Sequence, residues 1–268
     1  MKIGVSAIKG KMSRTIAGLI IQDTIVNLGG ALAKKDSNIV GEDLGEFLGY
    51  NSNNIKINDD IDDFVKSCDA IIDFSTPSLS LQIAKKCANY NKILVCGTTG
   101  FNEKEKEQLF LYSKNCVIIW SSNMSLGVNL LFNLVEKAAS LLHDDFDIEI
   151  VEMHHKYKAD SPSGTALSLG AAAAKGRGVD LQDHARMQRV GNDLSRNKNE
   201  IGFAVLRGGD VIGDHSVIFA GDGERIELSH KASNRDIFAK GAIRAAIWGL
   251  SKSSKEEYGF YSMRDVLK

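Results

Sequence analysis

The feature that most constrains the fold is an alternation, through the first half of the chain, of short apolar runs with longer stretches of helical spacing. Nearly every residue of these runs is apolar, rather than every second one, which is typical of strands buried on both faces. Such strands separated by helices predict a parallel sheet. The expected strands are Lys2–Val5, Gly29–Leu32, Ala70–Phe74, Ile93–Cys96 and Val117–Trp120, and the expected helices are Ser13–Asn27, Ser78–Asn89 and Glu103–Ser113.

After about residue 125 the pattern changes. Leu126–Leu142 has the apolar spacing of a long helix, and Phe146–Val151 alternates apolar with acidic residues, as a half-exposed strand does. The later strand candidates are joined by glycine-containing turns, which predicts a mixed or antiparallel sheet. These candidates are Gly202–Arg207, His215–Ala220 and Arg225–His230, with a polar stretch before them, Arg177–Asn199, predicted to be a loop, and a helix after them near Ile237–Leu250.

The length of 268 residues exceeds the usual size of one compact domain. We therefore expect two domains, residues 1–125 and 126–234, with a C-terminal segment of about 235–268 that packs back on the first. The expected fold class is α/β: a doubly wound parallel sheet, followed by an α+β domain with a mixed or antiparallel sheet.

Composition and charge exclude several classes of function. The 33 basic and 34 acidic residues are interspersed and give a formal net charge of -1, so no overall field would hold a polyanion and we expect no nucleic-acid partner. We find neither a membrane-spanning apolar segment nor a signal peptide, and we expect a cytoplasmic protein with no membrane partner. The four cysteines lack CxxC spacing and lie in or beside apolar segments, which predicts reduced, buried thiols.

The turn after the first strand is a candidate nucleotide site. In a dinucleotide-binding fold this turn is rich in glycine, because the pyrophosphate approaches backbone N–H groups at a helix N-terminus. Only Gly10 stands in register here, with Ala7 and Lys9 at the earlier glycine positions. An ordinary turn without a ligand is therefore an alternative. The candidate contacts are Ala7, Ile8, Lys9, Gly10, Lys11 and Met12.

Two further segments bear on the cofactor. Lys34 and Lys35 follow the second strand, where an acidic residue would accept the ribose of NAD and cations tolerate the 2′-phosphate of NADP. The two lysines favour NADPH, although a solvated turn is the alternative. Gly97, Thr98 and Thr99 follow a later strand, where small residues suit the crevice near a nicotinamide, or form a plain turn.

The segment from Glu152 to Ala166 is the most informative, because it leaves a strand and enters an alanine-rich helix. His154, His155 and Lys158 fall within five residues of one another, and Ser163, Gly164 and Thr165 begin the helix. A helix start offers N–H groups to a carboxylate and stabilises it by about 0.3–1 kcal/mol through the dipole. Proton-donating groups beside such a cradle suit a small anionic substrate.

This segment has two other interpretations. A histidine pair and a nearby lysine are commonly structural or solvated. A metal site is not predicted, because His154 and His155 point to opposite faces of an extended chain and no further ligand pattern accompanies them.

At these residues the chain resembles the 4-hydroxy-tetrahydrodipicolinate reductase family, long called dihydrodipicolinate reductases. The family pattern is a His-His pair, a nearby Lys, and then Asp-x-Pro-Ser-Gly-Thr-Ala. The resemblance extends nearly end to end through Gly10-Lys11-Met12, Asp73-Phe74-Ser75-x-Pro77, Gly97-Thr98-Thr99-Gly100-Phe101, Asn123-x-Ser125-x-Gly127-Val128-Asn129, Gly202-Phe203, Arg207-Gly208-Gly209-Asp210, His230-Lys231-Ala232-Ser233 and Met263-Arg264-Asp265-Val266-Leu267.

The resemblance implies a Rossmann-type N-terminal domain, a second domain that assembles a homotetramer, and reduction of a small cyclic dicarboxylate by NADPH or NADH. It implies that His154 is the acid/base residue, that Lys158 is a second proton donor, and that His155 contacts substrate. Gly164 and Thr165, with Ser163, would hold a carboxylate. Cofactor contacts would come from Ala7–Met12, Lys34, Gly97–Thr99 and the loop of Ser121, Ser122, Asn123 and Met124.

The chain also departs from the family pattern. The glycine-rich first turn is missing, and Ala33 stands where an acidic residue is common. A non-catalytic nucleotide-sensing protein is therefore a second hypothesis. A cysteine-dependent semialdehyde dehydrogenase is a third, but no cysteine lies in a loop beside a base, as that chemistry needs.

Overall fold

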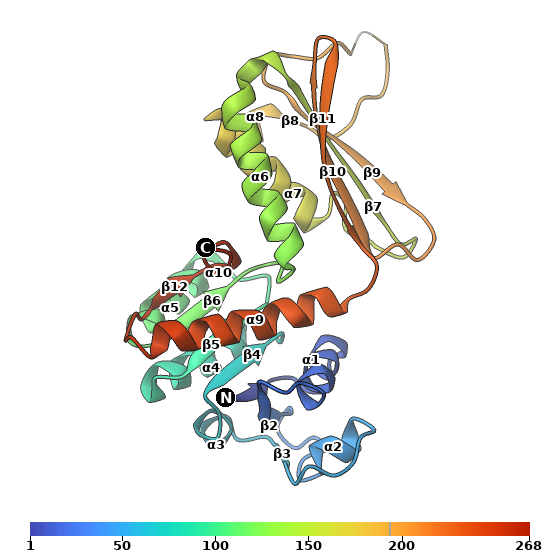
Figure 1. Cartoon of the computed structure of the whole chain (residues 1–268). Helices are drawn as coiled ribbons and strands as arrows, with labels where there is room; N and C mark the ends of the chain where they lie inside the picture. Colours follow the sequence, from blue (N-terminus) through green and yellow to red (C-terminus); the bar gives the residue numbers. More distant parts are fainter. Residues whose placement is uncertain (193) are drawn as a thin grey trace. The chain divides into compact units, whose positions relative to one another are not determined.

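The computed structural model describes residues 1–192 and 194–268 (Figure 1). It divides into two compact units. The first consists of Met1–Ser125 together with Asp236–Lys268, and the second is Leu126–Arg235. The second unit is thus an insertion into the first.

The described residues of the first unit form a parallel sheet in the order β12-β6-β5-β4-β1-β2-β3. Successive strands are added outward from β1 toward β3 on one side and from β4 toward β12 on the other, so the strand order reverses between β1 and β4. Ligands of such sheets bind at the carboxyl ends beside this reversal. The strands are β1 Lys2–Val5, β2 Asn27–Leu32, β3 Ile57–Asn58, β4 Ala70–Asp73, β5 Ile93–Cys96, β6 Val117–Trp120 and β12 Gly259–Tyr261.

Helices cover this sheet in two groups. Helix α9 packs beside α1 and contacts β4, β5 and β6, and Figure 1 shows it lying across the strands. Helices α3, α4 and α5 pack against one another in turn. The helices are α1 Lys11–Ile21, α2 Leu44–Phe47, α3 Ile61–Lys66, α4 Pro77–Tyr90, α5 Glu103–Tyr112, α9 Asp236–Ser253 and α10 Met263–Val266, with a 3-10 turn η1 at Ser113–Asn115.

The second unit packs two helices on one face of a mixed sheet. Its strands lie in the order β11-β10-β7-β9-β8, antiparallel from β11 to β7 and parallel from β7 to β8. Helices α6 and α7 lie side by side against the sheet (Figure 1). The elements are α6 Leu126–Leu142, η2 His143–Asp145, β7 Asp147–His154, α7 Gly164–Arg177, α8 Leu181–His184, β8 Ala185–Arg186, β9 Ile201–Arg207, β10 Gly213–Gly221 and β11 Glu224–Ala232.

The predicted fold class is confirmed, and some of the predicted element bounds need correction. The helix expected over Ser13–Asn27 ends at Ile21, because the Asp23 carboxylate accepts the N–H groups of Ile25 and Val26 and turns the chain into β2. The loop expected over Arg177–Asn199 contains α8 and β8, which are too short to show a periodic pattern. Strand β12 was not predicted.

Asp193, within that expected loop, lies outside the described residues. Across the parts of the chain that the structure describes, we find no helix with both the length and the hydropathy needed to cross a bilayer.

Candidate active site

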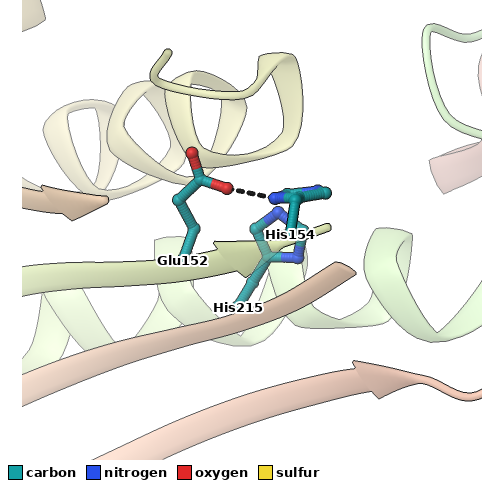
Figure 2. A group of neighbouring side chains, drawn as sticks. All are labelled: Glu152, His154 and His215. Atoms are coloured by element: carbon teal, nitrogen blue, oxygen red, sulfur yellow. Dashed lines mark ion pairs between the residues drawn. The ribbon is translucent and has the colours of Figure 1, made fainter. Parts of the chain in front are cut away.

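Strand β7 brings the candidate chemistry to the core face of the second unit. Its side chains alternate between the two faces, so Glu152 and His154 share the face of Ile148 and Ile150, and all four are buried. His215 of β10 pairs in register with Glu152. Figure 2 shows Glu152, His154 and His215 as one group of neighbouring side chains.

The Glu152 carboxylate is the centre of this group. Oε1 accepts the backbone N–H of Ser163 at 3.0 Å and the Arg207 guanidinium at 3.1 Å, while Oε2 faces Nδ1 of His154, a contact that is an ion pair when the imidazole is protonated (Figure 2). Burial acts to raise the pKa of Glu152, but the bonds from Arg207 and Ser163 outweigh it and hold the pKa below its usual value. Glu152 is therefore a buried carboxylate that stays charged.

The two imidazoles contact each other edge to face. The ring centroids of His154 and His215 lie 5.0 Å apart at an interplanar angle of 75°, and Nε2 of His215 is hydrogen-bonded to Oγ of Ser163 at 3.2 Å. Burial lowers the pKa of His215 to about 4. Burial also lowers the pKa of His154, and the opposing effect of Glu152 does not fully offset it. Both rings are therefore mainly neutral at pH 7.

The space beside Nε2 of His154 depends on a glycine. A Cβ built at Gly213 would lie 3.0 Å from this nitrogen and 3.4 Å from Cε1 of His215. Contacts this short are overpacked. The missing side chain of Gly213 therefore leaves room at the outward nitrogen of His154.

The other residues predicted around His154 are placed less centrally. Lys158 forms an ion pair with Asp160, at 2.7 Å and 2.8 Å to the two oxygens, and this bond lowers the pKa of the Asp160 carboxyl. His155 follows β7, is half-buried, and lies beside Tyr157. The Lys158 ammonium thus faces a carboxylate of the protein itself.

The residues predicted to hold a carboxylate lie at the start of a helix. Ser163 is the N-cap of α7, and its Oγ accepts the N–H of Ala166 at 3.1 Å. Gly164 and Thr165 are the first two residues of the helix, whose first turn contains no acidic residue. Ser163 thereby links the helix N-terminus to Glu152 through its N–H and to His215 through its hydroxyl.

Glu152, His154 and His215 each offer a potential metal-ligand atom, and these atoms lie within 4.8 Å of one another. The chemistry of the group fits hydrogen bonding better than a cation. Oε1 of Glu152 is already shared with Arg207, whose positive charge would oppose a metal ion, and Nε2 of His215 is bonded to Ser163. We therefore describe the group as a carboxylate–imidazole cluster.

Sequence reasoning missed Glu152, His215 and Arg207. Glu152 carried a usable signal, because the two-residue period that begins at Ile148 and Ile150 continues to Glu152 and His154. His215 and Arg207 are far from His154 in the sequence, and only strand pairing brings them to it.

The first turn of the other unit has the geometry of an anion site despite its missing glycines. Ala7 adopts φ +49°, a conformation that usually belongs to glycine, and Gly10 donates its N–H to the Ala7 carbonyl at 2.8 Å. Gly10 is the N-cap of α1 and has no side chain to occupy the helix start, and the first turn contains no acidic residue. The first-turn N–H groups of α1 can therefore face an anionic group, as pyrophosphate binding requires.

Buried Asp73 ties this turn to the other predicted cofactor segments. Its carboxylate accepts hydroxyl bonds from Ser6, just before Ala7, from Ser80, and from Thr98 at 3.2 Å. The side chain of Thr98 is thus turned inward, and Thr99 is exposed. Gly97 is small for a packing reason, because a Cβ there would lie 2.3 Å from the ring of Phe74.

The remaining predicted cofactor residues lie at two other strand ends. Lys34 and Lys9 are exposed, Ile8 donates its N–H to the carbonyl of Leu32 at 3.0 Å, and the Lys9 ammonium bonds Asn38 at 2.7 Å. The first turn and the lysine-bearing turn are therefore adjacent. The loop of Ser121, Ser122, Asn123 and Met124 follows β6, with Met124 buried and Ser122 exposed.

The cysteines do not support nucleophilic catalysis. All four are free and buried within the described part of the chain. Burial raises the pKa of Cys68 to about 11 and those of Cys96 and Cys116 to about 12. A thiolate at neutral pH is therefore not available from these residues.

Comparison with known proteins places the chain among named relatives. Residues 1–124 match the family model described as "Dihydrodipicolinate reductase, N-terminus", and residues 127–267 match "Dihydrodipicolinate reductase, C-terminus". A protein of Bartonella tribocorum named 4-hydroxy-tetrahydrodipicolinate reductase is 48% identical over 268 residues, covering 100% of this chain and 98% of that protein. A protein of the same name from Methylocella silvestris is 46% identical over 267 residues, covering 100% and 97%.

Solved structures support the fold. A dipicolinate-bound dihydrodipicolinate reductase from Paenisporosarcina sp. TG-14 superposes with a TM-score of 0.76 at 23% identity, covering 100% of this chain and 99% of the other. A probable dehydrogenase from Thermotoga maritima superposes with a TM-score of 0.58 at 12% identity, covering 100% and 92%.

Proposed function

Because the chain belongs to the dihydrodipicolinate reductase family, we propose that it reduces 4-hydroxy-tetrahydrodipicolinate to tetrahydrodipicolinate, in the diaminopimelate route to lysine. The observation that carries the proposal is identity of 43–48% along the whole chain to relatives with that name. A non-catalytic nucleotide-sensing protein is not favoured, because the candidate acid site is complete: His154 is buried and paired with a charged Glu152.

The reaction requires three changes in the substrate. Loss of the 4-hydroxyl group as water leaves a conjugated cyclic imine, hydride adds to C4, and a proton completes the product. A bound reduced nicotinamide dinucleotide would supply the hydride. The chain itself must bind the two carboxylates, orient the ring and deliver the proton.

The second unit offers groups for these tasks. Nε2 of His154 would donate the proton, with Lys158 as a second donor, while His155 would contact the substrate. Ser163, Gly164 and Thr165 would hold one carboxylate at the start of α7. Two negative charges beside His154 would raise its pKa from the lowered value of the ligand-free chain, and so favour the charged, proton-donating form.

The first unit offers the cofactor site. The open N-terminus of α1 and the turn Ala7–Met12 would take the pyrophosphate, and Gly97–Thr99 and Ser121–Met124 would lie beside the nicotinamide. Lys34 beside the ribose, with Lys9 in the adjacent turn, favours NADPH over NADH. The domains are accordingly a nucleotide-binding domain of residues 1–125, completed by about 235–268, and a substrate domain of 126–234.

The substrate class and the assembly are part of the proposal. A dicarboxylate is supported by the dipicolinate-bound relative with the same fold. A homotetramer is supported by the outer face of the mixed sheet, where Met153 and Ile218 are half-buried and Leu206 is 49% exposed. We further propose that the enzyme acts in the cytoplasm.

One experiment tests the activity. Purified protein would be mixed with enzymatically generated substrate and with NADPH or NADH in parallel, and oxidation of the cofactor followed by absorbance. We expect turnover with both cofactors and a higher kcat/KM with NADPH. His154→Gln should lower kcat by roughly 10²–10⁴-fold, as loss of a general acid does. Turnover by neither cofactor would refute the function, and near-normal turnover of the variant would refute the role of His154.

A further inference from the structure

Glu152 lies at the centre of the carboxylate–imidazole cluster, beside the proposed proton donor His154. We propose that Glu152 is a positioning residue, which holds the His154 imidazole with Nδ1 inward and Nε2 outward toward the substrate. The inference rests on the proposed function for the identity of the proton acceptor, and on the contacts of the second unit for everything else.

The first support is that Glu152 itself cannot turn away. Only 1% of its side chain is exposed, and its Oε1 is held by two donors from different elements, the N–H of Ser163 at the start of α7 and the Arg207 guanidinium on β9. Arg207 is fixed in turn by a 2.6 Å bond to the carbonyl of Asp160. The second oxygen, Oε2, is thereby left facing Nδ1 of His154.

The second support is the protonation of the partners. Glu152 stays charged and can only accept a hydrogen bond, so Nδ1 of His154 must carry a proton. In the neutral ring the unprotonated nitrogen is then Nε2. In the charged ring Nε2 carries the proton that faces outward. Either way, the nitrogen that exchanges a proton with a ligand is chosen by Glu152.

The third support is that the ring is confined on its other sides. His215 packs against it at nearly a right angle and is neutral at pH 7, so it adds bulk without competing charge. Beside Nε2, Gly213 has no side chain to fill the space. The ring is therefore enclosed at Nδ1 and has space beside Nε2.

The arrangement also couples the proton donor to the carboxylate cradle. Ser163 donates its N–H to Glu152 and caps α7 with its hydroxyl. A substrate carboxylate held at the start of α7 would thus lie beside Ser163, the residue that also donates its N–H to Glu152. The distance from that carboxylate to Nε2 of His154 is set by one short chain of bonds.

Glu152→Gln tests the proposal because the change is nearly isosteric. If the amide oxygen replaces Oε1 and keeps the bonds from Ser163 and Arg207, the amide NH₂ faces His154 and donates to it. Nδ1 must then be unprotonated in the neutral ring, and the proton moves to Nε2. We expect ¹⁵N NMR of labelled protein to show the neutral His154 protonated at Nδ1 in the parent protein and at Nε2 in the variant.

Kinetics supply the second measurement. We expect Glu152→Gln to lower kcat by roughly 10²–10⁴-fold, in the range found when a general acid loses its function, and to shift the pH limb assigned to His154 toward lower pH. The dissociation constants for NADPH and for pyridine-2,6-dicarboxylate should change less than about threefold. Glu149→Gln, on the outer face of the same strand, removes ion pairs with Arg189 and Arg196 and is the matched control.

Three results would overturn the proposal: an unchanged tautomer, a kcat within twofold of the parent, or a loss confined to ligand affinity. Stoichiometric zinc in the purified protein, with activity lost to a chelator, would also overturn it in favour of a metal site. If Glu152→Gln does not fold, Glu152→Asp withdraws the carboxylate from Nδ1 of His154 by one methylene, and a kcat within twofold of the parent would then overturn the proposal. The NMR readout needs no turnover, so a parent protein inactive on the proposed substrate would refute the function and leave this test intact.

Discussion

At the scale of single residues, Gly213 matters through the side chain it lacks. It begins β10 and lies beside the outward nitrogen of His154, where a Cβ would approach to 3.0 Å. Its φ is not in the left-handed region, so the glycine is not needed for backbone conformation. The absence of a side chain at Gly213 therefore serves to leave space for the substrate beside Nε2 of His154.

We predict that Gly213→Ala lowers kcat/KM by roughly 10- to 100-fold, because an overpacked methyl group costs about 1–3 kcal/mol and here acts where a substrate must approach. Steady-state kinetics measure the change. Gly208→Ala is the control, since a Cβ there meets only the flexible end of Met153 at 3.1 Å. Equal losses in the two variants would show that the turn as a whole, rather than the space at His154, is sensitive.

At the scale of elements, three strand ends of the parallel sheet meet at one buried carboxylate. Asp73 is the last residue of β4, Ser6 follows β1, and Thr98 follows β5. The hydroxyl groups of Ser6 and Thr98 both donate to Asp73. Because each belongs to a turn proposed to hold the cofactor, Asp73 fixes the spacing of those turns across the reversal of strand order.

We predict that Asp73→Asn raises the dissociation constant for NADPH about tenfold and lowers stability by about 1–3 kcal/mol. The amide NH₂ of Asn faces hydroxyl donors, so at least one buried bond is lost and the turns lose a shared anchor. Titration by nicotinamide fluorescence and urea unfolding measure the two effects. Asp62→Asn removes surface ion pairs to Lys66 and Lys86 and should leave the dissociation constant unchanged.

Elements with a clear apolar pattern could be predicted from the sequence, and elements without one could not. Leu126–Leu142 and Ile93–Cys96 were predicted with the bounds that the structure has, because each presents several residues of one period. Strand β12 has three residues and depends on pairing with β6, more than 130 residues earlier. Local pattern contains no information about a pairing at that separation.

The same limit applies to the candidate site. The segment from His154 to Thr165 is continuous in sequence, so its residues could be proposed together. The predicted strand ended at Val151 instead of His154, which hid the shared face of Glu152 and His154. His215 required the register of β10 on β7, which no spacing along the chain reveals.

At the scale of the whole molecule, buried neutral histidines make stability depend on pH. The pKa of His215 is about 4 in the folded chain and about 6.5 when unfolded. Between these values the unfolded chain binds a proton that the folded chain does not, so stability falls as pH falls. Carboxylates with a lowered pKa, such as Glu152, lower the free energy of unfolding further when they become protonated, at pH below about 4.5.

We predict that the unfolding free energy drops by about 2 kcal/mol between pH 7 and pH 5 on account of His215, from the linkage relation. Urea unfolding at the two pH values measures it, and His215→Gln should remove about that much of the difference. A variant that keeps the whole pH dependence would assign it to other groups, of which buried His154 and half-buried His230 also have lowered pKa values.

The nested arrangement of the two units has a consequence for synthesis. Leu126–Arg235 is complete once its last strand has left the ribosome, whereas the unit that starts the chain still lacks α9 and β12. Until those last residues emerge, β6 has an unpaired edge and β4, β5 and β6 lack the contacts of α9. The part translated first therefore finishes last, and a nascent chain stalled near residue 235 would present an exposed strand edge to chaperones or to other nascent chains.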